Sequence, residues 1–147
     1  MSKKNIIIFS TALFVLILDQ FTKFLIKQNF QFNQSAPIIK NIFHLTYITN
    51  TGSAFGLFKG FNFVFVVFSF IVMILIFYYI KKIKNNEKIL QFSIGLLLGG
   101  TIGNMIDRLL YSYVVDFIDF RIWPVFNIAD SAVTISIVFL ISLLWKE

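Results

Sequence analysis

Two aspartates in the C-terminal third of the chain, Asp116 and Asp130, have a setting that suits hydrolytic chemistry. Asp116 lies in a short polar stretch, residues 111–120, and Asp130 precedes an uncharged apolar run at residues 131–145. An ionisable group at the head of a membrane-spanning run is expensive to place, so we interpret it first as a site residue. Two carboxylates that lie close together cannot both ionise easily, so one keeps its proton while its ionised partner can activate water. The pair therefore predicts an aspartyl hydrolase built inside a bilayer.

The remaining side chains exclude the other common hydrolytic schemes. The chain has no cysteine and a single histidine, His44, which excludes thiol nucleophiles and histidine-rich zinc sites. Ser53 does not lie in the Gly-x-Ser-x-Gly pattern of serine hydrolases. His44 falls in a predicted strand, where we interpret it as an exposed or interfacial side chain. We therefore expect neither a metal nor a cofactor.

The elements that must position the carboxylates are membrane helices. Hydrophobic residues make up 58% of the 147-residue chain and charged residues 14%, whereas soluble proteins are roughly 25% charged. Four segments approach the roughly 20 residues that a helix needs to cross a bilayer, namely residues 5–26, 61–80, 89–110 and 125–145. No linker or repeat divides the chain. The sequence thus predicts an all-α polytopic membrane protein with four transmembrane helices in a single domain, residues 1–147.

The distribution of cationic side chains predicts the orientation of this bundle. One side holds Lys3, Lys4, Lys81, Lys82, Lys84, Lys88 and Lys146. The opposite side has cations spread over two longer loops, at Lys27, Lys40, Lys59 and Arg121. The positive-inside rule then places both termini in the cytoplasm. Because this topology explains the net charge of +6, we expect no nucleic-acid partner.

With that orientation, the polar side chains of the bundle converge on one leaflet. Near the outer ends of helices or in outer loops lie Asp19, Gln20, Lys23, Asn50, Asn104, Asp107, Arg108, Asp116, Asn127 and Asp130. We expect no comparable polar groups in the cytoplasmic half. This pattern argues against a continuous polar conduit, which disfavours a transporter, and predicts a site that opens to the outer face.

The outer loop between the first two helices predicts a small extracytoplasmic β-sheet. Residues 42–49 alternate in hydrophobicity and are rich in β-branched and aromatic side chains, as is typical of a strand. The turn that follows, residues 50–56, contains glycines able to adopt positive φ, and Asn50 can offer both a donor and an acceptor. Asn50 is either a functional residue or part of a plain loop.

The third helix combines small residues with a polar face. Glycine recurs every four residues, at Gly95, Gly99 and Gly103, which lets another helix approach closely. Asn104 and Arg108 follow at the same spacing with Asp107 beside them, so we expect these groups to share a face. They are either site residues or a structural ion pair in which Asn104 bridges helices. Asp19 and Lys23, an i,i+4 pair, have the corresponding alternative of anchoring the first helix.

The start of the fourth helix determines where the second carboxylate lies. Pro124 should start or precede this helix, because its ring fits only the first turn. Asn127 and Asp130 are three residues apart and share a face, with Asp130 roughly 8 Å below the helix start. Asp116 would reach this shallow, partly dry carboxylate from the preceding loop. We interpret Asp119 as a solvated surface charge.

Five blocks of the sequence, in order, carry a family resemblance. They are Asp19-Gln20-x-Thr22-Lys23, Asn50-x-Gly52-x-Ala54-Phe55, Gly99-Gly100-x-x-Gly103-Asn104-x-x-Asp107-Arg108, Val115-Asp116-Phe117 and Phe126-Asn127-x-Ala129-Asp130-Ser131. Together they resemble the lipoprotein signal peptidases, also called signal peptidase II. The resemblance covers most of the chain and includes the four-helix layout.

The resemblance implies an activity, a substrate and a site. The activity is that of an aspartyl endopeptidase of the bacterial inner membrane, which removes the signal peptide from prolipoproteins just before a diacylated cysteine. The implied catalytic dyad is Asp116 and Asp130. Residues that line or support the site would be Asn50, Gly52, Asn104, Arg108, Asn127, Asp19 and Asp107. The implied partners are the diacylated prolipoprotein and membrane lipid, and the outer strand would belong to a sheet that cradles the substrate.

Two other classes of function remain as alternatives. A small ion or proton transporter would use the buried acids as a relay, and it would need a dimer or polar residues across the full membrane. A non-enzymatic assembly factor would use the glycine stripe and would tolerate Asp130→Asn. For the enzyme we expect a monomer.

Overall fold

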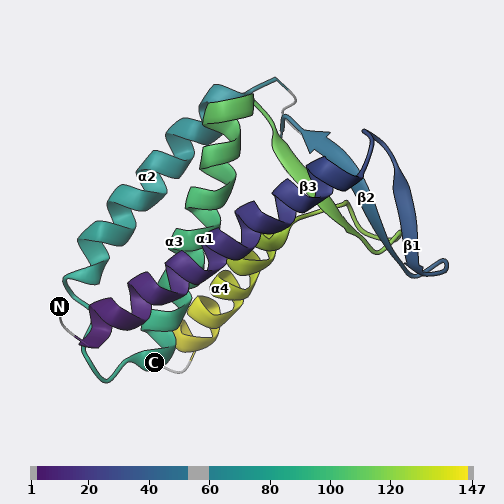
Figure 1. Cartoon of the computed structure of the whole chain (residues 1–147). Coiled ribbons are helices and arrows are strands. Elements are labelled where there is room, and N and C mark those ends of the chain that lie inside the picture. The colour runs from purple at the N-terminus through teal and green to yellow at the C-terminus, as the bar shows by residue number, and fades with distance from the viewer. Residues whose placement is uncertain (1–2, 53–59, 146–147) are drawn as a thin grey trace.

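The computed structural model describes residues 3–52 and 60–145 of the chain. These residues form four α-helices, α1 (Lys3–Asn29), α2 (Asn62–Ile80), α3 (Lys88–Tyr111) and α4 (Ile128–Leu144), and three β-strands, β1 (Ser35–Ile39), β2 (Phe43–Asn50) and β3 (Val114–Asp119). The helices form a bundle with the sheet at one end and both termini at the other (Figure 1). The expectations for Ser53, Ala54, Phe55, Gly56, Lys59 and Lys146 concern positions outside the described residues.

All four predicted helices are present. By length and composition, α1, α2 and α3 can each cross a membrane. The fourth, α4, is apolar but has 17 residues, which at about 1.5 Å per residue gives roughly 26 Å, less than the hydrocarbon thickness of about 30 Å. The expectation of helices long and apolar enough to cross a membrane is therefore confirmed for three of the four.

Helix α3 lies at the centre of the bundle, where its glycines allow close packing against α1 and α4. A Cβ atom added at Gly99 would lie 2.6 Å from the backbone oxygen of Ala12 in α1, and one at Gly100 would lie 2.5 Å from that of Ala129 in α4. Contacts this short exclude any side chain, so the packing role predicted for the glycine stripe is confirmed. The backbones of α1 and α4 can therefore bring short polar side chains into contact with α3.

The sheet is antiparallel with the order β1-β2-β3. Strand β2 confirms the strand predicted in the first outer loop. Strand β3 was not expected, and Asp116 lies within this strand rather than in a loop. Its residues are buried on both faces, so the sequence lacks the alternation that marks a half-buried strand. Val115 and Phe117 pack against Ile26 of α1, which attaches the sheet to the bundle.

Helix α4 begins later than expected. Asn127 is its N-cap: its Oδ1 accepts from the backbone N–H of Asp130 at 2.8 Å, and the Asp130 carboxylate accepts from the backbone N–H of Asn127 at 3.3 Å. This reciprocal capping box fixes the helix start at Ile128. Pro124 precedes the helix, as predicted. Asp130 lies in the first turn, so the estimate of roughly 8 Å below the helix start was wrong.

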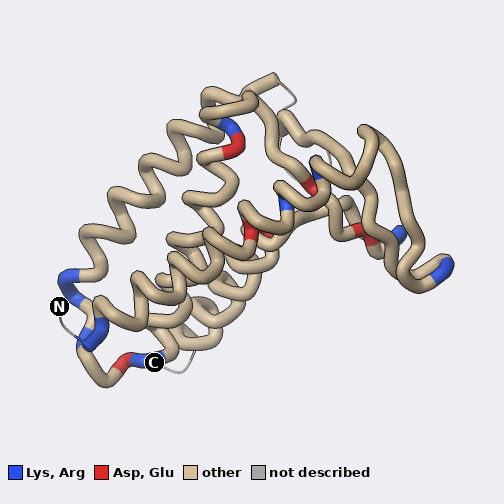
Figure 2. Tube along the Cα trace, in the orientation of Figure 1, with Lys and Arg blue, Asp and Glu red and all other residues tan. Residues whose placement is uncertain are grey.

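Charged side chains are distributed unevenly along the bundle (Figure 2). Lysines gather at the end that holds the termini, where Lys4 donates to the carbonyls of Ile80 and Ile83 at 3.0 and 2.8 Å. The expectation of no comparable polar groups in this half was partly wrong. Gln91 and Ser93 of α3 are fully buried there. Both are uncharged, and the buried carboxylates of the described residues all lie in the other half or in the sheet.

Candidate active site

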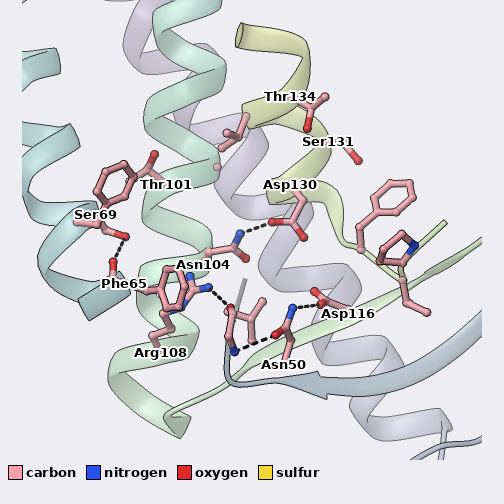
Figure 3. Close-up of a pocket in the computed structure, with 18 of the residues that line it drawn as sticks. Asn50, Phe65, Ser69, Thr101, Asn104, Arg108, Asp116, Asp130, Ser131 and Thr134 are labelled. Atoms are coloured by element: carbon pink, nitrogen blue, oxygen red, sulfur yellow. Dashed lines mark hydrogen bonds between the residues drawn. The ribbon is translucent and has the colours of Figure 1, made fainter. Parts of the chain in front are cut away.

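A cavity of about 570 Å³ lies between α2, α3 and α4, next to the sheet (Figure 3). Its polar lining includes six of the nine residues selected from the sequence, namely Asn50, Gly52, Asn104, Arg108, Asp116 and Asp130. The other three, Asp19, Asp107 and Asn127, are buried behind this lining. On the opposite side the cavity has an apolar wall from α2, formed by Phe65, Phe68 and Val72.

One residue, Asn127, joins the two carboxyl groups through its side chain and its backbone. Its Nδ2 donates to Oδ1 of Asp116 at 2.7 Å, and its backbone N–H donates to Oδ2 of Asp130 at 3.3 Å, while its Oδ1 accepts from the backbone N–H of Asp130 at 2.8 Å. The N-cap of α4 is thus also the residue that holds Asp116. Because Asn127 binds both β3 and the first turn of α4, the two carboxyl groups meet at the edge of one cavity.

Two further amides bind the remaining carboxyl oxygens. Asn50, at the end of β2, donates to Oδ2 of Asp116 at 3.0 Å. Asn104 of α3 donates to Oδ1 of Asp130 at 2.7 Å. With the two bonds from Asn127, both oxygens of each carboxyl group accept a hydrogen bond, so neither group is free to rotate.

The environment of Asp116 disfavours its ionised form. Its side chain is 1% exposed. Burial, followed by the nearby negative charge of Asp130, raises the pKa of Asp116 from 3.8 to about 7, against the opposing hydrogen bonds of Asn50 and Asn127. A buried carboxyl with a like charge beside it is the arrangement that keeps one proton in an acidic pair.

Lys23 determines how the Asn104 amide is oriented. Its Nζ lies 2.9 Å from Oδ1 of Asn104, and the residue is only 3% exposed. An ammonium group can only donate hydrogen bonds, so it must face the amide oxygen. The amide nitrogen is thereby left to donate to Asp130. Sequence reasoning did not place Lys23 among the site residues, although a lysine within an apolar helix was a usable signal.

Lys23 also forms a buried triad with two carboxylates. Its Nζ is 2.7 Å from Oδ2 of Asp19 and 3.0 Å from Oδ2 of Asp107. Asp19 accepts from the backbone N–H of Ala129 at 2.9 Å, and Asp107 accepts from that of Val115 at 3.2 Å. The triad therefore ties α1 and α3 to the elements that carry Asp130 and Asp116. This gives Asp19 and Asp107 a supporting role.

Asp107 and Arg108 point in different directions, so the expectation that they share a face was wrong. Arg108 lines the cavity, where its Nη2 donates to the carbonyl of Gly52 at 3.3 Å and its guanidinium lies 5.0 Å from the centre of the Phe65 ring. The ion partner of Asp107 is Lys23 of α1 and not its neighbour Arg108. Asn104 does bridge helices, because it links α3 to Asp130 of α4.

Asp119 is not the solvated surface charge that the sequence suggested. It is 5% exposed and accepts from Oγ1 of Thr46 at 2.7 Å and from the backbone N–H of Arg121 at 2.8 Å. Burial acts to raise the pKa of Asp119, but the hydrogen bonds from Thr46 and Arg121 outweigh it and the pKa is lowered. Asp119 is absent from the cavity lining, as is His44, whose Nδ1 lies 3.1 Å from Oγ of Ser35.

The arrangement suits hydrolysis by a pair of acids. Two carboxyl groups reach one cavity, burial and the neighbouring negative charge raise the pKa of Asp116, and surrounding amides fix both. Among the described residues, no group of three His, Cys, Asp or Glu side chains is placed to hold a metal ion. The chemistry that these groups can perform is general acid–base activation of water.

Comparisons with known proteins find relatives of this chain. Residues 11–146 match the family model described as signal peptidase (SPase) II. The chain is 43% identical to the lipoprotein signal peptidase of Halothermothrix orenii, over 95% of this chain and 96% of that protein. It is 47% identical to that of Moorella thermoacetica, over 88% and 86%. A bacterial membrane enzyme solved by the in meso method at 2.3 Å superposes with a TM-score of 0.88 at 38% identity, covering 92% of this chain and 85% of the other.

We predict that Lys23→Met markedly lowers the melting temperature of the detergent-solubilised protein. The substitution leaves Asp19 and Asp107 buried without a cation, and breaking a buried pair in this way costs about 3–5 kcal/mol. Lys88→Met, at an exposed position on α3, is the control and should change the melting temperature little. Adding Asp107→Asn to Lys23→Met should recover part of the loss. Equal melting temperatures for Lys23→Met and Lys88→Met would contradict the triad's structural role.

Proposed function

The chain belongs to the signal peptidase II family, and from this membership we propose that it is an aspartyl endopeptidase that removes the signal peptide from prolipoproteins. Cleavage occurs just before a cysteine that carries diacylglycerol. The single observation that carries the proposal is the pair Asp116 and Asp130, joined by Asn127 at the edge of one cavity. The substrate class is supported by the name of the relatives, lipoprotein signal peptidase.

In the proposed reaction the two carboxyl groups have different roles. Asp116, with a pKa of about 7, holds the proton that polarises the scissile carbonyl. Asp130 accepts from the Asn104 amide and from a backbone N–H at the start of α4, which offset part of the cost of burying its charge. In the proposal Asp130 is the ionised partner and takes a proton from the attacking water.

The reaction passes through a tetrahedral diol, whose breakdown restores the starting protonation of both aspartates. Attack of the water oxygen on the carbonyl carbon, with transfer of the Asp116 proton to the carbonyl oxygen, gives a tetrahedral diol. As the carbon–nitrogen bond breaks, Asp130 gives its proton to the departing amine of the cysteine residue. A diol hydroxyl returns a proton to Asp116, and the signal peptide leaves with a new carboxyl group. No cofactor takes part.

The cavity suits a substrate that is embedded in the membrane. Its walls include Phe65 and Phe68 of α2 and Val133 and Ile135 of α4, so a hydrophobic peptide can lie between these helices. At the polar end, Nε of Arg108 is buried without a hydrogen-bond partner among the described residues. We assign this free donor to a carbonyl group of the substrate.

We further propose a monomeric, single-domain protein of the bacterial cytoplasmic membrane, with all four helices spanning and with the sheet and cavity at the outer face. The clustering of lysines at the end that holds both termini supports this orientation. A reporter fused after Lys84 should report the cytoplasm, and one within residues 31–40 should report the exterior. An external signal at Lys84 would place the cavity at the wrong face and contradict the proposal.

The function is tested by incubating the purified protein with a diacylated prolipoprotein and measuring released signal peptide. We expect cleavage by the wild-type protein and none by Asp116→Asn or Asp130→Asn, both of which should stay folded because each removes like-charge repulsion. Asp119→Asn is the matched control and should retain most activity. An active Asp130→Asn would contradict the dyad, and a wild-type protein that releases no signal peptide would favour a non-enzymatic role. An inactive Asp119→Asn beside an active Asp116→Asn would show that Asp130 has a different partner.

The same assay tests the lipid requirement. A lipid anchor away from the scissile bond can supply orientation to the reacting group. We therefore expect a precursor with serine in place of the lipidated cysteine to be cleaved at a negligible rate. Equal rates for the two precursors would contradict the proposed substrate while leaving the dyad in place.

The raised pKa of Asp116 predicts how cleavage depends on pH. Because Asp116 acts in its protonated form, activity should fall as pH rises through about 7, approaching about tenfold per pH unit well above it. Burial and then the charge of Asp130 raise the pKa of Asp116, and Asn50, Asn127 and Lys23 lower it. Asn50→Ala removes one of the lowering hydrogen bonds and should move the fall in activity to higher pH. A rate that rises through pH 7, or an opposite shift in Asn50→Ala, would contradict the assignment.

A further inference from the structure

The cavity extends beyond the dyad, away from the sheet, and two threonines line this deeper part. Thr101 is three residues before Asn104 on α3, and Thr134 is four residues after Asp130 on α4. The two helices run in opposite directions (Figure 1), so at about 1.5 Å per residue both threonines lie roughly 5–6 Å farther from the sheet than these partners. In Figure 3 they lie on the far side of Asn104 and Asp130 from the sheet.

The hydroxyl groups of these two threonines are free. Four hydroxyl side chains line the cavity, and two of them donate to carbonyls of their own helix: Ser69 to Phe65 at 2.8 Å and Ser131 to Asn127 at 2.9 Å. Such bonds to the preceding turn are the usual solution for a hydroxyl in a membrane helix. Thr101 and Thr134 make no side-chain hydrogen bond within the described part of the chain, so their full hydrogen-bonding capacity remains available.

A peptide that is cut inside a membrane needs hydrogen-bond partners at this depth. The scissile segment must leave its helix to meet the dyad, and each unwound residue exposes an N–H and a C=O among the apolar side chains of the deeper cavity. An unsatisfied backbone group in hydrocarbon costs several kcal/mol. The deeper walls of the cavity are otherwise formed by apolar side chains such as Phe68, Val72 and Val133. A threonine hydroxyl can donate to a carbonyl and accept from an N–H, so it can satisfy either group.

We propose that Thr101 and Thr134 form a subsite for the main chain of the substrate, at the residues that precede the scissile bond. This subsite rests on the proposed function, in which those residues belong to the signal peptide and lie deeper in the bilayer than the cysteine. The hydroxyls bind backbone groups exposed by unwinding, whereas the neighbouring apolar walls receive the side chains. The subsite therefore holds an unwound segment without selecting its sequence.

The test uses the purified protein and full-length diacylated precursors. Thr101→Val and Thr134→Val remove a hydroxyl and keep the shape of the side chain, and each should lower kcat/KM by about two- to tenfold, the usual effect of one hydrogen bond. Serine at either position should restore the rate to within about twofold of wild type, because it keeps the hydroxyl. Thr11→Val is the matched control: Thr11 lies in α1, its side chain likewise makes no hydrogen bond to a described residue, and it is not part of the cavity lining. It should leave kcat/KM unchanged.

A second set of precursors separates main-chain binding from a structural effect. In each, an ester replaces one amide among the second to fourth residues before the scissile bond, which removes an N–H and weakens a carbonyl. At one or more positions, the wild-type protein and Thr11→Val should cleave the ester precursor more slowly than the amide precursor. The Thr101→Val or Thr134→Val variant that lacks the corresponding hydroxyl should cleave both precursors at the same rate. If the loss from the ester and the loss from the valine substitution multiply at every position, the subsite is overturned. It is also overturned if both valine variants have the kcat/KM of wild type. If wild type cleaves no precursor, the proposed function fails and the subsite with it.

Discussion

The site depends on the hydrogen bonds made by the side chain of Asn127. It is fully buried, it caps α4 by accepting from Asp130, and its Nδ2 reaches Asp116 at 2.7 Å and Oδ1 of Asn104 at 3.1 Å. One amide therefore links α4, β3 and α3. A short side chain can do this only if the three backbones approach closely, so the helix packing and the position of the sheet are both constrained by the same residue.

The close packing of the helices and the buried charges serve this constraint together. Gly100 lets Ala129 of α4 lie directly against α3, and Gly103 leaves room for the carboxylate of Asp19. Lys23 then neutralises the two carboxylates behind the site and fixes the amide of Asn104. All four oxygens of the Asp116 and Asp130 carboxyl groups accept hydrogen bonds from the protein, as suits a site for which the bilayer supplies no partners. Nε of Arg108, which has no partner among the described residues, belongs to a side chain that lines the cavity.

Much of the fold follows from the sequence because hydropathy and glycine spacing report directly on membrane helices. The positions of Asp116 and Asp130 were also accessible, since isolated acids next to apolar runs are conspicuous. The sequence did not reveal strand β3, because burial on both faces removes the alternation that identifies a strand. Nor did it indicate that Asp119 is buried, since its partner Thr46 lies on another strand. Contacts between distant segments decide such features, and a single sequence carries no local pattern for them.

Infrared spectra of the purified protein, recorded as pH is raised from about 5 to about 9, would test most directly whether the two carboxyl groups share a proton. We expect the C=O stretch of a protonated carboxyl group that persists near pH 6 and disappears as pH passes about 7. This band should be missing from Asp116→Asn and retained in Asp119→Asn. A wild-type protein whose carboxyl groups all deprotonate near pH 4 would contradict a shared proton and the division of roles between Asp116 and Asp130.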